Sequence, residues 1–217
     1  MILGFDPDTH TYPLDGDPLV SVTTVLAPLM DFSWMPPAVR AAALERGSLV
    51  HDAIAADNTR DLDDGAFRRT CPEYVPYLEA WRSFRESRRF VPLLNEYRVA
   101  SPRHRVAGTL DTIGTMDGHG ALVDFKTGDP RDVAADLQTA GYVALVTEWN
   151  TVAEDPILAD VLARFPVLRR YAIQLRPDGT FRVEAYTKPT DFRDFFTLLA
   201  SHHLIAKRRG RRAAEAA

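Results

Sequence analysis

The segment GTLDTIGTMDGHGALVDFKTG, residues 108–128, decides the fold that we expect for this chain. The apolar character of residues 106–115 and 121–126 predicts two β-strands. Asp117-Gly118 between them is the strongest short signal for a two-residue hairpin turn. The sequence therefore predicts a tight β-hairpin near the middle of the chain.

The register of this hairpin brings two carboxylates together. A two-residue turn places Met116 opposite His119, and counting back along both strands places Asp111 directly opposite Asp124. Cross-strand partners have Cβ atoms roughly 4.5–5.5 Å apart, so two carboxylates at such positions could share one cation. A turn at Gly118-His119 would instead shift the register and separate the pair.

Lys126 falls on the same strand face as Asp124, because side chains alternate along a strand and Phe125 points to the other face. Arginine supplies nearly all of the 26 basic residues, so a lysine inside an apolar strand invites a specific explanation. Opposed carboxylates repel each other unless a cation lies between them, and Mg²⁺ prefers oxygen ligands. The pattern predicts a metal-dependent phosphodiesterase site of Asp111, Asp124 and Lys126. The alternative is an Asp–Lys salt bridge on a solvated strand face.

The rest of the chain alternates helices with strands. Before the hairpin we expect short strands or turns over residues 1–20, a short capped helix over 21–29, a helix from Pro36-Pro37 to about Ala56, an exposed loop over 57–72, a helix over about 73–90 and a strand over 93–100. After it we expect a helix over about 131–149 opened by Asp129-Pro130, a short helix within 151–166, a hairpin of 169–175 and 181–186, and a last helix from about Thr190 toward a basic tail, 207–212. This order predicts an α/β or α+β fold, with a small central mixed sheet flanked by helices.

Length and composition favour one domain over residues 1–217, because 217 residues with 46% apolar content can build one sizeable core. Within it we expect a helical part over about 20–90, a catalytic core over about 91–190, and the C-terminal helix with its basic tail.

No run approaches the roughly 18 apolar residues of a membrane helix, and the N-terminus does not resemble a signal peptide. The single cysteine, Cys71, fits a reducing, cytoplasmic setting. The net charge of −4 argues against indiscriminate binding to nucleic acid but not against a local basic groove.

Four short motifs occur in a fixed order along the chain: GSLVH at 47–51, GTLD at 108–111, VDFKTG at 123–128 and QTAGY at 138–142. Together they resemble the RecB-like branch of the PD-(D/E)XK nuclease superfamily, over roughly residues 20–145. Phe125 stands where this branch usually has tyrosine, and Leu110 where the founding motif has proline. The resemblance implies a restriction-endonuclease-like core.

The resemblance also implies roles for individual residues. Asp111 and Asp124 would bind Mg²⁺ or Mn²⁺, together with the backbone carbonyl of Phe125, and Lys126 would be the catalytic lysine. His51 would be a further metal ligand from the helix, four residues after Gly47 and on the same helix face. Without the motif, a core or surface histidine is the simpler interpretation of His51.

Other candidate residues have weaker support from the sequence. Glu96, on the strand before the hairpin, could join the acidic cluster for a second cation, or it could be an exposed strand-edge glutamate. Gln138 and Tyr142 share a helix face and would position substrate or brace the lysine; ordinary helix packing is the alternative. Arg103 and Arg105 could meet phosphates, or belong to a solvated loop. The basic tail could follow nucleic acid electrostatically, although a frayed terminus is the simpler expectation.

The expected function is a metal-dependent deoxyribonuclease, and the resemblance favours an exonuclease on single-stranded DNA or duplex ends, in recombination, repair or phage DNA metabolism. The SVTTVL segment, residues 21–26, is similar to that of stand-alone phage members and of the mitochondrial genome maintenance exonuclease. A single cysteine cannot supply the four-cysteine set of the iron–sulfur members. Partners would be DNA and replication or recombination proteins, with oligomeric state left open. The alternatives are an inactive nucleic-acid-binding relative, a structure-selective or sequence-specific endonuclease, and a hydrolase of another phosphate ester.

Overall fold

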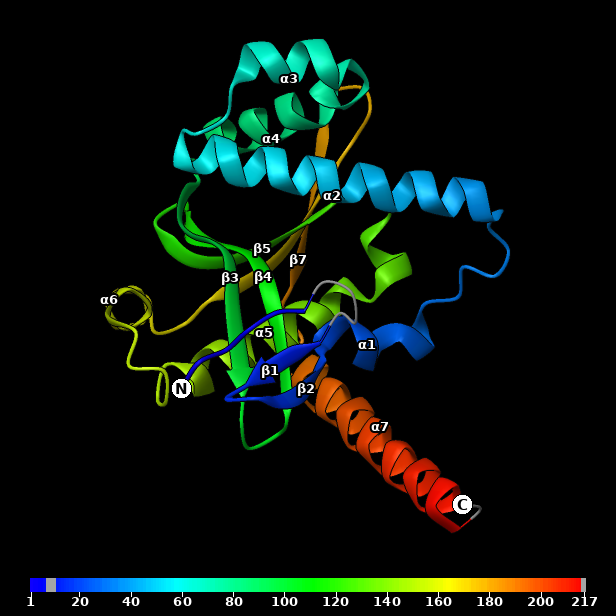
Figure 1. Cartoon of the computed structure of the whole chain (residues 1–217). Coiled ribbons are helices and arrows are strands. Elements are labelled where there is room, and N and C mark those ends of the chain that lie inside the picture. The colour runs from blue at the N-terminus through cyan, green and yellow to red at the C-terminus, as the bar shows by residue number, and fades with distance from the viewer. Residues whose placement is uncertain (7–10, 216–217) are drawn as a thin grey trace.

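The computed structural model describes residues 1–6 and 11–215, so residues 7–10 of the expected N-terminal strand region lie outside it. Within the described residues, the hairpin lies at the centre of a seven-stranded mixed sheet (Figure 1). The strands are β1 (Tyr12–Leu14), β2 (Asp17–Ser21), β3 (Val91–Ser101), β4 (Val106–Met116), β5 (His119–Lys126), β6 (Arg169–Leu175) and β7 (Phe181–Tyr186). The helices are α1 (Val22–Leu26), α2 (Pro37–Thr59), α3 (Asp64–Thr70), α4 (Val75–Ser87), α5 (Ala135–Trp149), α6 (Pro156–Arg164) and α7 (Thr190–Glu215).

The hairpin of β4 and β5 has the predicted turn and register. Met116 pairs with His119, and the antiparallel ladder continues to the pair Thr112–Val123. Asp117 and Gly118 both take positive φ, at 50° and 81°, as a two-residue type I′ turn requires. The ladder ends one step before Asp111 and Asp124 would pair.

The end of this ladder leaves part of the β4 edge open. β3 pairs with β4 along one edge, from Val106 to Thr115. On the other edge β5 pairs only from Thr112 onward, and β2 pairs in parallel with Val106 and Ala107. Within the described part of the chain, residues 108–111 therefore have no strand partner on this edge. We call this opening, residues 108–111 of β4, the fork.

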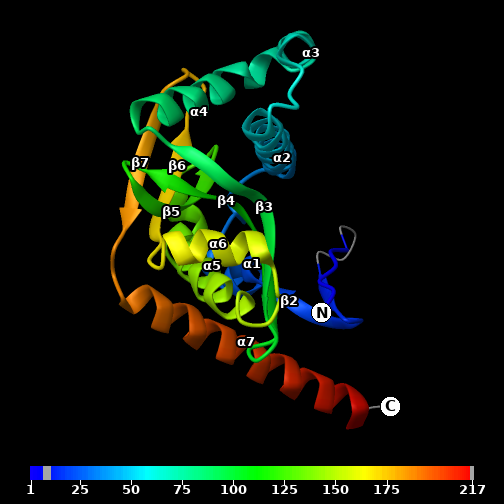
Figure 2. The same ribbon diagram turned by 90° about the vertical axis from the view of Figure 1, so that its left-hand side faces the viewer.

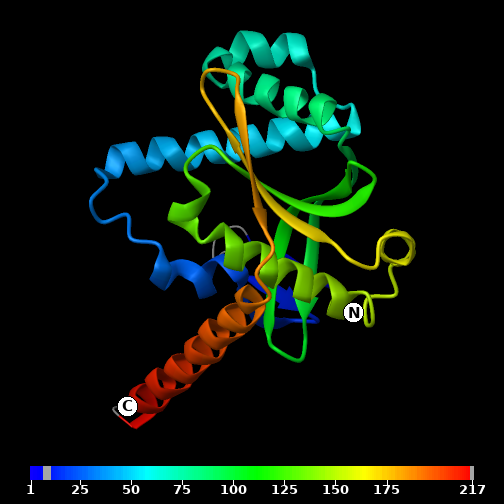
Figure 3. The same ribbon diagram turned by 180° about the vertical axis from the view of Figure 1, so that it is seen from behind.

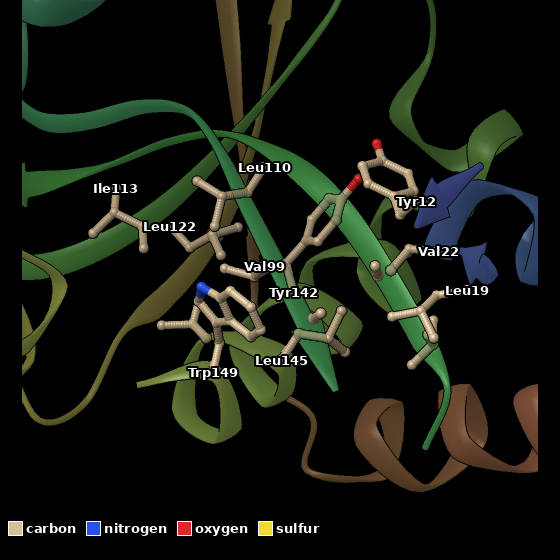
Figure 4. Close-up of a cluster of buried hydrophobic side chains, with 14 of the residues drawn as sticks. Tyr12, Leu19, Val22, Val99, Leu110, Ile113, Leu122, Tyr142, Leu145 and Trp149 are labelled. Atoms are coloured by element: carbon tan, nitrogen blue, oxygen red, sulfur yellow. The ribbon is translucent and has the colours of Figure 1, made fainter. Parts of the chain in front are cut away.

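Helices cover both faces of the sheet (Figures 2 and 3). α2 and α4 pack on one face, where Trp81 and Phe84 contact the aromatic rings of Phe90 and Phe125 or lie close to them. α5 packs on the other face, and α1 and α7 pack against α5. The second core between α5 and the sheet includes Tyr142 and Trp149 (Figure 4). The sheet is therefore buried on both faces, and the fork lies between its two helical layers.

α2 is longer than the sheet needs. Its C-terminal half buries Val50, Ala53 and Ile54, whereas Val39 and Leu44 in its N-terminal half are exposed. Figure 1 shows this N-terminal half projecting beyond the strands, linked by the segment 30–36 to the region of α1. As predicted, prolines open the helix and Ser21 caps α1, its side chain accepting a hydrogen bond from the backbone N–H of Thr24 at 2.9 Å.

Two predicted boundaries are wrong. The loop expected over 57–72 contains α3, because the Asp63 side chain caps it and Asp64 pairs with Arg82 at 2.7 Å. The helix expected from about 131 begins only at Ala135. Residues Pro130–Val133 form a 3₁₀ helix, and Ala134, with φ of 48°, separates it from α5.

The C-terminal tail, expected to fray, is part of α7, which continues to Glu215. Figures 1 and 3 show the end of α7 projecting away from the body of the protein. Arg170 of β6 anchors the beginning of this helix through a buried ion pair with Asp191, at 2.7 Å. None of the helices in the described residues is both long and apolar enough to cross a membrane.

Candidate metal centre

The Asp111 side chain lies at the fork, where it replaces a missing ladder bond. Its Oδ2 accepts a hydrogen bond of 2.6 Å from the backbone N–H of Phe125. Asp111 and Asp124 occupy the facing positions that the register predicts, but they do not form a ladder pair. The carboxylate thus holds β5 beside β4 while the strands separate, and this fixes its own position.

Asp124 is almost completely buried beside Lys126. The exposed fraction of the Asp124 side chain is 1%, and its Oδ2 lies 2.7 Å from Lys126 Nζ. Its Oδ1 is buried and has no hydrogen-bond donor among the described residues. An unsatisfied buried acceptor is costly, and a bound cation would satisfy it.

His51 reaches the same place from α2. Its Nδ1 lies 3.5 Å from Asp111 Oδ1, and its Nε2 lies 3.0 Å from the backbone carbonyl oxygen of Phe125. Gly47 lies one helical turn earlier on α2 and lines, with His51, the open cleft described below. A Cβ at this glycine would meet no atom within 4 Å. The glycine therefore leaves open space beside the histidine.

Glu96 completes the group from β3. It lies across from Asp111, between the pairs Asn95–Thr112 and Tyr97–Leu110, and takes a φ of 44° that is unusual for a strand. Its Oε1 is 4.0 Å from His51 Nδ1. Ligand atoms of His51, Glu96 and Asp111 all lie within 4.8 Å of one another.

The charges of these groups shift their pKa values. Burial opposes protonation of His51, but the charge and hydrogen bond of Asp111 outweigh it and raise the pKa to about 9. Burial and the Asp111 charge raise the pKa of Glu96 to about 7, and burial raises that of Asp124 to about 6. Burial would raise the pKa of Asp111, but His51 and Lys126 hold it below its usual value. Without a metal, protons partly balance the carboxylates.

The arrangement of donors fits a hard divalent cation. Adjacent ligands of an octahedral ion with bonds of about 2.1 Å lie about 3.0 Å apart. His51 Nε2 and the Phe125 carbonyl oxygen lie 3.0 Å apart, the length of a hydrogen bond, and this separation is also compatible with adjacent ligand positions. The unpartnered Asp124 Oδ1 and the clustered Asp111 and Glu96 carboxylates supply the oxygen ligands that Mg²⁺ or Mn²⁺ prefers.

Gln138 and Tyr142 reach the fork from α5. Tyr142 is 3% exposed, and a side-chain hydrogen bond joins it to Gln138. A Cβ on Gly108 would lie 2.7 Å from Tyr142 Cε1, so this ring packs closely on the sheet face at the fork. Figure 4 shows Tyr142 reaching from α5 past the core side chains to the neighbourhood of Tyr12.

An open cleft with a volume of about 820 Å³ is lined by the residues of the candidate site other than the buried Asp124, namely His51, Glu96, Asp111, Phe125, Lys126, Gln138 and Tyr142. Arg103 and Arg105 are not among its lining residues: the Arg103 backbone N–H lies 3.3 Å from Glu148 Oε1, and Arg105 donates to the Pro18 carbonyl. The arginines that line the cleft are Arg40, Arg46 and Arg98. The sequence did carry a signal for Arg40, since positions 40, 44, 47 and 51 fall on one helix face.

A solved structure from Eubacterium rectale, named "Putative exonuclease", is similar with a TM-score of 0.49 and 13% identity, over 75% of this chain and 66% of that one. No protein among the curated sequences matches this chain. The family model of the PD-(D/E)XK nuclease superfamily matches residues 33–214, a range that contains all the residues of the candidate metal centre. The chain belongs to the PD-(D/E)XK nuclease superfamily.

Proposed function

We propose that this protein is a Mg²⁺- or Mn²⁺-dependent deoxyribonuclease whose active site is the candidate metal centre. One observation carries the proposal. Asp124 is buried with an unpartnered carboxylate oxygen, within an ion pair of Lys126 and beside the cluster of His51, Glu96 and Asp111. The Lys126 ammonium pairs with Oδ2, and a metal ion at Oδ1 would satisfy the other oxygen.

In this proposal His51, Asp111, Asp124 and the Phe125 carbonyl hold the cation, and Glu96 contributes to it or to a second one. A bound Mg²⁺ or Mn²⁺ would polarise the scissile phosphate and lower the pKa of an attacking water. The Phe125 N–H holds Asp111 in place, and the position of α2 sets the distance from His51 Nε2 to the Phe125 carbonyl oxygen.

Lys126 acts as a cation. Burial would lower the pKa of its ammonium group, but the charges of Asp124 and Asp111 raise it above the usual value. A lysine that stays protonated cannot remove a proton from water. Its N–H groups instead donate to the phosphate or to the attacking water, and its charge offsets the negative charge that develops on the phosphate.

We further propose that the substrate is a DNA end or single strand, as the RecB-like resemblance implies, and that the reaction serves recombination, repair or phage DNA metabolism. The lining of the cleft supports the proposal of a nucleic-acid substrate. His51, Glu96 and Asp111 line the cleft together with Arg40, Arg46 and Arg98, which suits a strand that carries phosphates.

The direct test is digestion of end-labelled single- and double-stranded DNA with Mg²⁺ or Mn²⁺, comparing wild type with Lys126→Ala and Asp124→Asn. We expect metal-dependent release of short products by wild type and at least a 100-fold loss in either variant. Unchanged cleavage by Lys126→Ala, or no cleavage by wild type with either metal, would refute the assignment.

Closed circular DNA separates the two modes of cleavage. An exonuclease leaves covalently closed single-stranded and duplex circles intact, whereas an endonuclease opens them. RNA of the same sequence tests the preference for DNA, and a small phosphodiester tests the alternative of a general phosphoesterase.

A further inference from the structure

The cleft also has an apolar part, which metal chemistry does not require and which we call the apolar wall. It is lined by Phe5, Tyr12, Met30, Phe32, Met35 and Leu44. The nuclease family match begins at residue 33, so most of these residues belong to a segment outside the match. This apolar wall therefore needs its own explanation.

Part of the wall is open to solvent. Leu44 is 65% exposed although it lines the cleft, and Met30, Phe32 and Met35 are each partly exposed. Single exposed apolar residues are common, but apolar side chains that gather in one cleft beside charged groups are typical of a ligand-binding groove. The ligand must offer apolar surface close to a phosphate that reaches the metal centre.

Cations lie among these apolar groups. Arg40 and Leu44 share the helix face of Gly47 and His51, so this arginine lies further along α2 from the metal centre. Arg46 also lines the cleft, and its buried Nε has no hydrogen-bond acceptor among the described residues. Arginines spaced along a cleft suit a chain of phosphates.

Unpaired nucleotides offer both kinds of surface at once. A single strand presents charged phosphates and free base faces, and base faces stack on aromatic and apolar side chains. A duplex presents phosphates outward, and its base faces are already stacked inside. The mixed lining of this cleft therefore matches single-stranded nucleic acid.

We propose that the wall of Phe32, Met35 and Leu44 binds the bases of unpaired nucleotides next to the scissile phosphate, with Phe32 as the stacking ring and Arg40 on the backbone. The inference rests on the proposed nuclease function and adds to it a base-binding subsite. The subsite recognises base faces without reading sequence, because every base has such a face.

Binding of fluorescent oligo(dT), compared with an abasic strand of the same length, tests this subsite. Both are measured by anisotropy with Mg²⁺ present and Lys126→Ala as the parent, so that cleavage does not interfere. We expect the parent to bind oligo(dT) about tenfold more tightly than the abasic strand, since stacking on one aromatic ring contributes on that scale. Adding Phe32→Ala should remove most of this preference and leave abasic affinity unchanged.

The matched control is Trp34→Ala, because Trp34 is an aromatic residue two positions away that is 70% exposed and does not line the cleft. Trp34→Ala should keep the preference for oligo(dT) over the abasic strand. Leu44→Ala gives a second test of this preference at an exposed position where folding is not at risk. Arg40→Ala should weaken the binding of both strands equally. Equal binding of both strands by the parent, or equal effects of Phe32→Ala and Trp34→Ala, overturns the subsite.

The outcomes also separate the two proposals. If wild type cuts DNA with Mg²⁺ but the parent binds both strands equally, only the base-binding subsite fails. If wild type neither binds nor cuts DNA with Mg²⁺ or Mn²⁺, both proposals fail together.

Discussion

The Nε2 atom of His51 lies 3.0 Å from the backbone carbonyl oxygen of Phe125, although the two residues are 74 positions apart in the chain. The contact joins α2 to the end of β5 at the point where β5 leaves β4. If both atoms are metal ligands, the packing of α2 on the sheet sets the geometry of the site.

His51→Ala should therefore weaken metal binding. Groups that only support metal ligands contribute roughly 10–100-fold to affinity, and loss of a ligand should have at least this effect. Titration with Mn²⁺ in a calorimeter measures the change. His119→Ala is the control, because His119 lies exposed at the hairpin turn. Equal Mn²⁺ affinity in both variants would exclude His51 as a ligand.

Metal binding should also depend on pH. The pKa of His51 is raised to about 9, so without metal its protonated form stabilises the fold fully below about pH 6.5 and this contribution is lost as pH rises through about 9. The raised pKa values of Glu96 and Asp124, about 7 and 6, act in the same direction, because their ionised forms are disfavoured in the fold.

We therefore expect the increase in melting temperature on adding Mn²⁺ to be larger at pH 8.5 than at pH 6, since a cation competes with these protons. Thermal unfolding with Mn²⁺ and with EDTA at each pH measures it. The His51→Ala variant should show a weaker pH dependence. A stabilisation by Mn²⁺ that is equal or larger at pH 6 would contradict the proton competition.

Gly108→Ala should destabilise the protein, by about 1–3 kcal/mol. A Cβ at this position would lie 2.7 Å from Tyr142 Cε1 and 3.4 Å from Val22 Cγ2, inside a packed core. Urea unfolding gives the free-energy change. A second substitution, Tyr142→Leu, removes the ring and should make the double variant more stable than the sum of single effects predicts. Strict additivity would show that the ring is not the obstacle.

Gly47→Ala should instead stabilise the protein, by roughly 0.5–1 kcal/mol, because alanine is the better helix former and no atom lies within 4 Å of the new Cβ. Gly47→Leu would fill cleft space beside His51 and should reduce cleavage without reducing stability. Ala42→Leu is the matched control, on an exposed part of α2 that does not line the cleft. Equal activity of the two leucine variants would count against substrate passing Gly47.

Asp191→Ala should destabilise the protein by about 3–5 kcal/mol, because it leaves the buried Arg170 guanidinium without its carboxylate partner. Asp194→Ala removes an exposed partner of Arg193 on the same helix and should change stability by less than about 1 kcal/mol. Denaturant unfolding of both variants compares them. Similar losses would mean that the buried pair does not anchor α7.

The sequence was most informative where chain geometry is local. A two-residue turn fixes the register of the β4–β5 hairpin, and Asp124 and Lys126 share a face because strand side chains alternate. The end of the ladder before Asp111 could not be foreseen, because there the N–H of Phe125 bonds to the Asp111 side chain in place of the β4 backbone.

Long-range features needed more than local pattern. His51 came to the site only through the family motif, since no local rule docks α2 beside Phe125. Arg103 and Arg105 seemed close to Asp111 in the sequence, but six residues of strand from Arg105 span about 20 Å, and the loop lies at the far end of β4. The left-handed Ala134 had no signal either, because alanine rarely adopts that conformation.

At the fork, the Asp111 carboxylate has both a structural role and a role in the candidate metal centre, and this restricts which substitutions the protein can tolerate at this position. Asp111 Oδ2 takes the N–H of Phe125 that a neighbouring strand would otherwise bind, so its loss loosens the sheet as well as the site. Asparagine at this position would keep an acceptor for that N–H, whereas alanine would not. We therefore expect inactive relatives that keep this fold to carry asparagine, which retains the hydrogen-bond acceptor, at the position of Asp111.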